Sequence, residues 1–174
     1  NDIRLPIMNQ LIPRADYDAA EKAKQEGDIF SPQTNTPFGL LQRRFMSPLG
    51  IPCQEPPYGT LTAIDLASRK ILWSKPLGTV EDAGPLGMHM GLSVPIGMPT
   101  LGGPITTSSG LVFMAGTQDY YIRALDIKTG KELWKGRLPV GGETTPMTYV
   151  SPKSGRQFVV ISAGGNRTTD IRGD

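Results

Sequence analysis

The sequence has few of the residues from which cross-links and metal centres are built. Its 174 residues include one cysteine, Cys53, and one histidine, His89. A single cysteine cannot form an intramolecular disulfide, and the chain has no Cys/His spacing of the kind that binds zinc. A disulfide-rich module and a zinc finger are therefore excluded.

Blocks of one charge sign are also missing. Lys and Arg number 18 against 16 Asp and Glu, the net charge is +2, and no basic block exceeds a pair such as Arg43 and Arg44. Proteins that bind nucleic acid usually concentrate basic residues on one surface. We therefore expect no nucleic-acid partner.

The chain lacks a hydrophobic run suited to crossing a membrane. Residues 83–118 contain no Asp, Glu, Lys or Arg, but 12 of them are glycine or proline, which would leave backbone groups unsatisfied in lipid. This stretch predicts a loop followed by strands. The first residues do not resemble a signal peptide, and the missing initiator methionine leads us to expect a piece of a longer protein.

Glycine, with 21 positions, and proline, with 16, are abundant instead. Both disfavour helix interiors, so the composition indicates a turn-rich, mainly β chain. One short surface helix is predicted over residues 14–26, before Gly27. Proline-rich residues 31–59 predict an irregular but ordered loop. Short strands are predicted at residues 60–65, 71–74, 105–107, 111–116, 122–126, 132–137, 147–150 and 157–163.

Two segments of the chain repeat each other without a gap. Residues 63–73 and 124–134, 61 positions apart, share the frame Ala-x-Asp-x-x-(Ser/Thr)-x-x-x-Leu-Trp. Each copy predicts a β-hairpin whose Asp caps the turn and whose Trp packs on a neighbouring unit. Repeated units with a periodic aromatic residue are typical of a β-propeller, and the spacing leaves a loop insertion at residues 78–103.

The repeated frame resembles the tryptophan-docking motif of quinoprotein dehydrogenases. Residues 145–150, 155–161 and 163–165 resemble the last blade of that family, and residues 47–54, 56–61 and 84–91 resemble its membrane-bound glucose dehydrogenase branch. The resemblance implies about three blades of a partial eight-bladed propeller. In this organisation residues 1–59 are a helix and loop inserted in the propeller, and residues 60–174 are its C-terminal blades.

The resemblance also implies an activity for the full-length protein. The family oxidises D-glucose or another aldose with pyrroloquinoline quinone and a Ca²⁺ or Mg²⁺ ion, and passes electrons to ubiquinone. We therefore expect a full-length enzyme at the periplasmic face of the bacterial inner membrane, anchored by an N-terminal part absent here. The catalytic residue and the metal ligands would lie upstream, so we expect this segment alone, without the remainder of the propeller, to be inactive.

Two places in the segment are candidates for contact with ligands. The resemblance makes His89, in the Gly/Met/Pro-rich loop, a substrate-binding residue. It also places Gly164, Gly165 and Asn166 beside the quinone, where glycine permits close backbone approach and Asn offers amide donors. Trp73, Trp134, Asp65 and Asp126 are interpreted as structural residues of the repeat.

Two other readings of the repeat remain open. A non-enzymatic propeller of the outer-membrane assembly lipoprotein type would explain both tryptophan motifs, although it would not require the long Gly/Met/His loop. A quinoprotein alcohol dehydrogenase would also fit, because the adjacent cysteines of that family lie upstream of this region.

Overall fold

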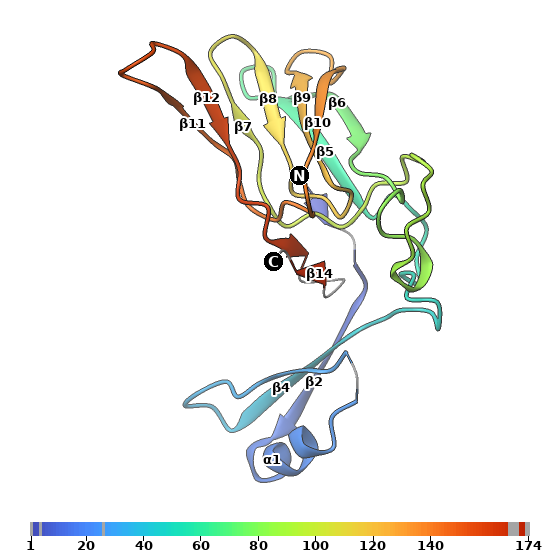
Figure 1. Ribbon diagram of the computed structural model, residues 1–174. Coiled ribbons are helices and arrows are strands. Elements are labelled where there is room, and N and C mark those ends of the chain that lie inside the picture. The colour runs from blue at the N-terminus through green and yellow to red at the C-terminus, as the bar shows by residue number, and fades with distance from the viewer. Residues whose placement is uncertain (1, 4, 26, 167–170, 173–174) are drawn as a thin grey trace. The chain divides into compact units, whose positions relative to one another are not determined.

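The computed structural model describes residues 2–3, 5–25, 27–166 and 171–172. They form two compact units, one of residues 5–55 and one that joins the first residues to everything from Pro56 onward. Strands predominate in both units (Figure 1). This confirms the predicted mainly β fold class.

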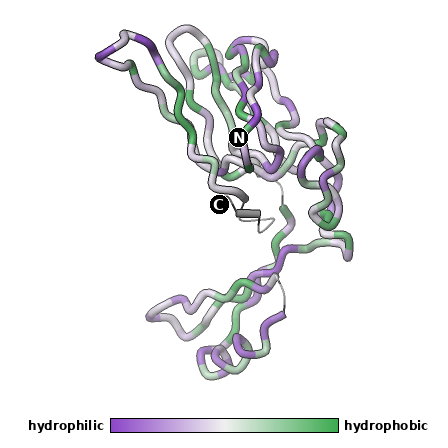
Figure 2. Tube along the Cα trace, in the orientation of Figure 1, coloured by the Kyte–Doolittle hydropathy of each residue, from purple (hydrophilic) through white to green (hydrophobic). Residues whose placement is uncertain are grey.

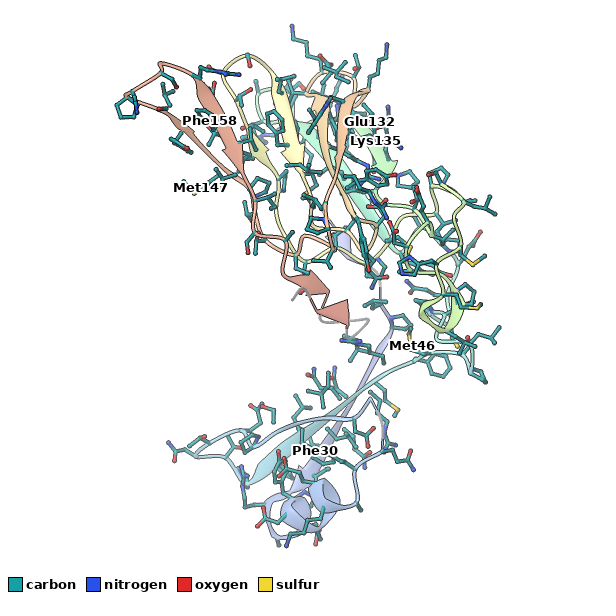
Figure 3. The ribbon with its side chains drawn as sticks, in the orientation of Figure 1. Phe30, Met46, Glu132, Lys135, Met147 and Phe158 are labelled. Carbon is teal, nitrogen blue, oxygen red and sulfur yellow. The ribbon has the colours of Figure 1, made fainter. Side chains whose placement is uncertain are left out.

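Residues 5–55 form a three-stranded antiparallel sheet with one helix packed on it. The elements are β2 (Ile7–Pro13), α1 (Arg14–Lys22), β3 (Ile29–Ser31) and β4 (Phe38–Arg44), and the strand order is β2-β4-β3. Tyr17 of α1 is buried against Ile12 and Leu41, and Phe30 meets the Tyr17 ring edge-on. Phe30 is labelled in Figure 3. Arg14 ties the β3–β4 connection to the helix by donating to the carbonyl oxygens of Gln33 and Phe38.

Two local predictions need correction in this unit. The helix begins at the predicted Arg14 but ends at Lys22, four residues before the predicted end. The predicted irregular loop over residues 31–59 is wrong in its middle, because Phe38–Arg44 is the central strand of the sheet. Prolines such as Pro37 and Pro48 flank this strand and do not interrupt its hydrogen bonds.

The second unit is built from antiparallel hairpins. Its elements are β1 (Asp2–Ile3), β5 (Gly59–Asp65), β6 (Lys70–Pro76), the short 3-10 helix η1 (Pro85–Gly87), β7 (Ile105–Thr106), β8 (Leu111–Met114), β9 (Tyr121–Asp126), β10 (Glu132–Arg137), β11 (Met147–Val150), β12 (Gln157–Val160), β13 (Gly165–Asn166) and β14 (Ile171–Arg172). All eight predicted strands are present, although β12 ends at Val160, three residues before its predicted end.

The strands β7 to β10 form one complete propeller blade. They make a four-stranded sheet in the order β10-β9-β8-β7 (Figure 1). The sequence repeat makes β5 and β6 the equivalents of β9 and β10, so β5 and β6 belong to the neighbouring blade. In that blade β1 pairs with β5, as β8 pairs with β9 in the complete blade. Residues 5–55 are thus inserted between two neighbouring strands of one blade.

The two blades pack through the repeated tryptophan motif. The indole Nε1–H of Trp73 donates to the carbonyl oxygen of Ile127, 2.9 Å away, and the ring lies on Gly130. Trp73 and Ile127 flank a core of buried side chains from both sheets, namely Leu61, Leu77, Val112, Met114 and Leu125. The predicted packing role of Trp73 between blades is confirmed.

The aspartates of the repeat hold their own turns, as predicted. Asp65 accepts hydrogen bonds from Ala67 N and Ser68 Oγ, and Asp126 accepts from the backbone and hydroxyl of Thr129. Hydrogen bonds from Ser68 and Thr129 respectively lower the pKa of each carboxyl. Both carboxylates therefore serve turn geometry.

The connections carry much of the polar sequence, as at the hydrophilic tip of the β11–β12 hairpin (Figure 2). Within the described residues, no helix has the length and apolar character needed to span a bilayer.

Candidate functional site

The long loop between β6 and β7 is fastened to the blades by backbone hydrogen bonds at both ends. Met98 N donates to Leu77 O at 2.7 Å, and Leu101 N donates to Gly116 O at 3.2 Å. Within the loop, Met90 N donates to Glu81 O at 2.9 Å. These backbone hydrogen bonds hold the loop although residues 83–118 contain no Asp, Glu, Lys or Arg.

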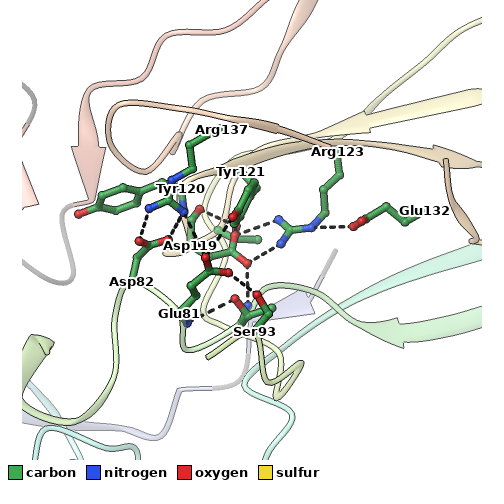
Figure 4. A network of polar contacts seen from close by, with 11 residues as sticks. Glu81, Asp82, Ser93, Asp119, Tyr120, Tyr121, Arg123, Glu132 and Arg137 are labelled. Atoms are coloured by element: carbon green, nitrogen blue, oxygen red, sulfur yellow. Dashed lines mark hydrogen bonds and ion pairs between the residues drawn. The ribbon is translucent and has the colours of Figure 1, made fainter. Parts of the chain in front are cut away.

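Asp82 is a buried acid of this loop, and Figure 4 shows it bound to Arg137. Its side chain is 2% exposed, and it accepts hydrogen bonds from the backbone N–H of Tyr120 at 2.9 Å and from Arg137 Nη1 at 2.7 Å. Arg137 Nη2 donates to the other carboxylate oxygen. A buried carboxylate needs such partners, and here a guanidinium and an amide supply them.

The pKa of Asp82 reflects a competition between burial and these partners. Burial by itself would raise the pKa, but the hydrogen bonds from Arg137 and Tyr120, with the charge of Arg137, outweigh it and leave the pKa below its ordinary value. The Arg137 pKa is raised, chiefly by its hydrogen bond to Asp82. The pair is therefore charged at neutral pH.

His89 lies next to the carboxylate of Asp82. Its Nδ1 is 3.5 Å from Asp82 Oδ1, while its side chain is 63% exposed. The imidazole also meets the Tyr120 ring edge-on, with centroids 5.9 Å apart. The predicted site residue is thus an exposed imidazole with one side held by a buried acid and an aromatic ring.

A second buried ion pair, between Asp119 and Arg123, holds the start of the same loop. Asp119 is fully buried and is held by Arg123 Nη1 at 2.9 Å and by the backbone N–H of Thr79 at 2.7 Å. Arg123 also donates to Glu132 at 3.1 Å. Because Thr79 begins the loop and Arg123 belongs to β9, this pair fixes the root of the loop to the blade.

Glu81 joins the two sets of contacts. Its carboxylate accepts a hydrogen bond from Tyr121 Oη at 3.1 Å and from the Ser93 hydroxyl, and it lies 3.9 Å from Arg137 Nη1 (Figure 4). The Arg137 guanidinium in turn lies over the Tyr121 ring at 4.8 Å. The adjacent acids Glu81 and Asp82 thus dock the loop on β9 and β10.

The predicted quinone-contacting residues lie at the exit of β12. Gly164 is exposed, and the space beside it, where a side chain would project, is open. Gly165 begins β13 with φ +91°, and its N–H donates to Gly141 O at 3.1 Å. Asn166 pairs with Ile171 in the backbone of β13, and its side chain lies outside the described part of the structure.

The structure brings His89 together with Asp82, Tyr120 and Arg137, which sequence reasoning missed. Among the described contacts, no hydrogen bond, ion pair or ring contact joins His89 to Gly164 or Gly165. A signal for Asp82 was available, because Glu81 and Asp82 are the last charged residues before the uncharged stretch. In the described residues, no cluster of three or more His, Cys, Asp or Glu side chains could hold a metal ion.

The four-stranded blade β7–β10, with the β5–β6 hairpin docked on it through Trp73, places this protein in the class of β-propeller proteins. A family profile described as the PQQ glucose/ethanol/alcohol dehydrogenase β-propeller domain matches residues 1–159. The chain belongs to this family, and the predicted membership of the quinoprotein dehydrogenases is confirmed.

Curated relatives align along the whole chain. The chain is 57% identical to a probable quinate dehydrogenase (quinone) of Xanthomonas campestris pv. juglandis and 52% identical to the quinate/shikimate dehydrogenase (quinone) of Acinetobacter baylyi, in both cases over 100% of its length. It is 42% identical to the quinoprotein glucose dehydrogenase of Escherichia coli over 95% of its length. It spans only 22%, 22% and 21% of these relatives.

Solved structures support the fold. The quinohemoprotein alcohol dehydrogenase from Comamonas testosteroni matches with a TM-score of 0.52 and 23% identity, over 97% of this chain and 22% of that one. A europium-containing methanol dehydrogenase matches with a TM-score of 0.51 and 22% identity, over 92% of this chain and 22% of that one. The predicted partial propeller is therefore confirmed.

Proposed function

We propose that the full-length protein oxidises a hydroxyl group of a quinate- or shikimate-type ring acid with pyrroloquinoline quinone. The observation that carries this substrate class is the graded similarity, with 57% and 52% identity to relatives named for quinate or shikimate against 42% to one named for glucose. D-glucose or another aldose is the second candidate, favoured by alignment with glucose dehydrogenases over 95% of the chain.

His89 is the residue of this segment that we assign to the substrate. Its side chain is exposed, and an imidazole can form a hydrogen bond with a hydroxyl group. The charged group that faces it is the carboxylate of Asp82, and the guanidinium of Arg137 is bound to that carboxylate. These surroundings favour a neutral hydroxyl group over a carboxylate, so a ring hydroxyl of the substrate would face His89.

The residues at the exit of β12 fit a flat cofactor. The open space beside Gly164 would let a planar ring approach the backbone, and the positive φ of Gly165 turns the chain at this point. We assign Gly164, Gly165 and Asn166 to the surroundings of pyrroloquinoline quinone. When bound, this cofactor would accept the two reducing equivalents released by the alcohol.

The remaining expectations concern the rest of the protein. We propose that its Ca²⁺ or Mg²⁺ ligands and its catalytic residue lie outside this segment, and that electrons pass to ubiquinone at the periplasmic face of the inner membrane. The words "(quinone)" in the names of two relatives support a quinone acceptor. On this proposal, the isolated segment has no dehydrogenase activity.

The test is an assay of the full-length holoenzyme, reconstituted with pyrroloquinoline quinone and either Ca²⁺ or Mg²⁺, with an artificial electron acceptor. Quinate, shikimate and D-glucose are compared as substrates by kcat/KM. We expect quinate or shikimate to exceed glucose by about 100-fold or more, because a site whose polar groups pair with one substrate leaves some of them unpaired with another. A higher kcat/KM for glucose would refute the ring-acid proposal and leave the second candidate.

A further inference from the structure

The buried acid beside His89 has a geometry that sets the direction of the imidazole. Asp82 Oδ1 faces Nδ1 at 3.5 Å, and Tyr120 limits the ring from another side. The two ring nitrogens of histidine point to different sides, so Nε2 is turned away from Asp82. A side chain that is 63% exposed leaves Nε2 accessible to a ligand.

The carboxylate also selects which nitrogen carries the proton. An ionised carboxylate only accepts hydrogen bonds, so in the neutral imidazole the proton belongs on Nδ1 and Nε2 is left as an acceptor. An alcohol substrate offers an O–H donor, which matches this acceptor. A base oriented by a second, buried group is a recurrent arrangement in enzyme sites.

Asp82 is itself held firmly, so it can fix the orientation of the exposed His89 imidazole. The side chain is 2% exposed, and Arg137 and the Tyr120 N–H bind it from the blade side. Its three partners come from β10, from the residue before β9 and from its own loop. A displacement of the carboxylate would break contacts with all three.

We propose that Asp82 is a positioning residue that holds His89 with Nε2 presented as an acceptor to a hydroxyl group of the substrate. This inference rests on the proposed function, because it takes His89 as the substrate-binding residue. It adds a role for a buried acid that does not touch the substrate.

The kinetic test uses the full-length holoenzyme and whichever substrate it oxidises. Asp82→Asn, His89→Asn and the double variant are compared, with Asp65→Asn as a matched control because Asp65 caps a turn in the repeat. We expect each single variant to raise KM about tenfold with little change in kcat, and the double variant to be no worse, because the two residues act as a unit. Asp65→Asn should keep the wild-type KM.

An unchanged KM in Asp82→Asn, or effects of the two single variants that multiply in the double variant, would overturn the proposal.

Arg137→Gln tells whether Asp82 positions His89 or only anchors the loop. It leaves the Asp82–His89 contact in place, so its KM should rise less than that of Asp82→Asn. Equal rises would mean that Asp82 acts only as an anchor.

A second measurement needs no variant and no turnover. Diethyl pyrocarbonate modifies unprotonated imidazole nitrogens, and peptide mass spectrometry reports the rate at His89 in the wild-type protein. Saturating substrate should slow this modification by about fivefold or more, because Nε2 would be occupied. An unchanged rate would overturn the assignment even if an Asp82 variant failed to fold.

The two proposals can fail separately. If the enzyme oxidises glucose and not quinate, the substrate class is wrong, while glucose can still shield His89 and the Asp82 role stands. If quinate is oxidised with a high kcat/KM but does not shield His89, the proposed substrate class stands, whereas the assignment of His89 to the substrate and the inference about Asp82 are both refuted.

Discussion

Gly130 shows how one residue can decide the contact between two blades. Its φ is +65°, a region that costs an ordinary L-residue about 1–2 kcal/mol. A Cβ at this position would lie 2.6 Å from the ring of Trp73. We therefore expect Gly130→Ala to lower the apparent melting temperature of the full-length protein and to raise the exposure of Trp73, which tryptophan fluorescence can follow.

Arg69 supplies the matched control, because it is the equivalent residue in the other copy of the repeat. It also has a positive φ, +56°, although it is not glycine. Arg69→Gly relieves that strain but adds freedom to the unfolded chain, and the two effects are each about 1 kcal/mol. Its melting temperature should stay at or slightly above that of the wild type. A loss of stability in Arg69→Gly equal to that in Gly130→Ala would contradict this account.

At the scale of an element, the loop between β6 and β7 should depend on the charge of Asp82. Because the pKa of Asp82 is lowered on folding, its contribution to stability is present above the unfolded value, near 3.8, and is lost as the pH falls through the lower folded value. Hydrogen exchange of the Met90 and Gly91 amides, corrected for intrinsic rates, should keep its protection at pH 5 and lose it in acid.

Asp82→Asn provides the comparison for this pH effect. Without the carboxylate, loop amides should be less protected at neutral pH, and the difference from the wild type should shrink in acid. Loss of protection in both proteins at the same pH and to the same degree would assign the effect to general acid unfolding.

The same scale explains which elements could be predicted from the sequence. The strands β5 to β12 are recognisable because turn residues such as Lys128, Thr129 and Gly130 separate short apolar runs, and both signals are local. The strand β4 was missed because its partner β2 lies some thirty residues earlier, and such pairing leaves no local signal.

The candidate site was found only in part for the same reason. His89 stood out as a single residue, whereas Asp82 matters through contacts with Tyr120 and Arg137 that the fold creates.

At the scale of the whole molecule, the two tryptophans of the repeat differ in their surroundings within the described residues. Trp73 of the preceding blade is docked on the Gly130 turn, but its repeat equivalent Trp134 is 53% exposed and packs beside Gly136 of its own strand. The β11–β12 hairpin beyond it carries exposed apolar side chains, among them Met147 and Phe158 (Figure 3). An unsatisfied blade surface of this kind favours association.

We therefore expect the 174-residue segment, produced alone, to self-associate in a concentration-dependent way. Burial of Trp134 and the hairpin face would drive this association, so Trp134→Lys combined with Val160→Lys should reduce it. Light scattering coupled to size-exclusion chromatography measures the mass, with Leu66→Lys, at another exposed apolar position, as the control. A monomer over a wide concentration range with a sharp, reversible melt would show that the segment is a self-sufficient domain. It would then follow that repeats in a propeller can be stable without a neighbour on each side, contrary to the nearest-neighbour coupling on which this expectation depends.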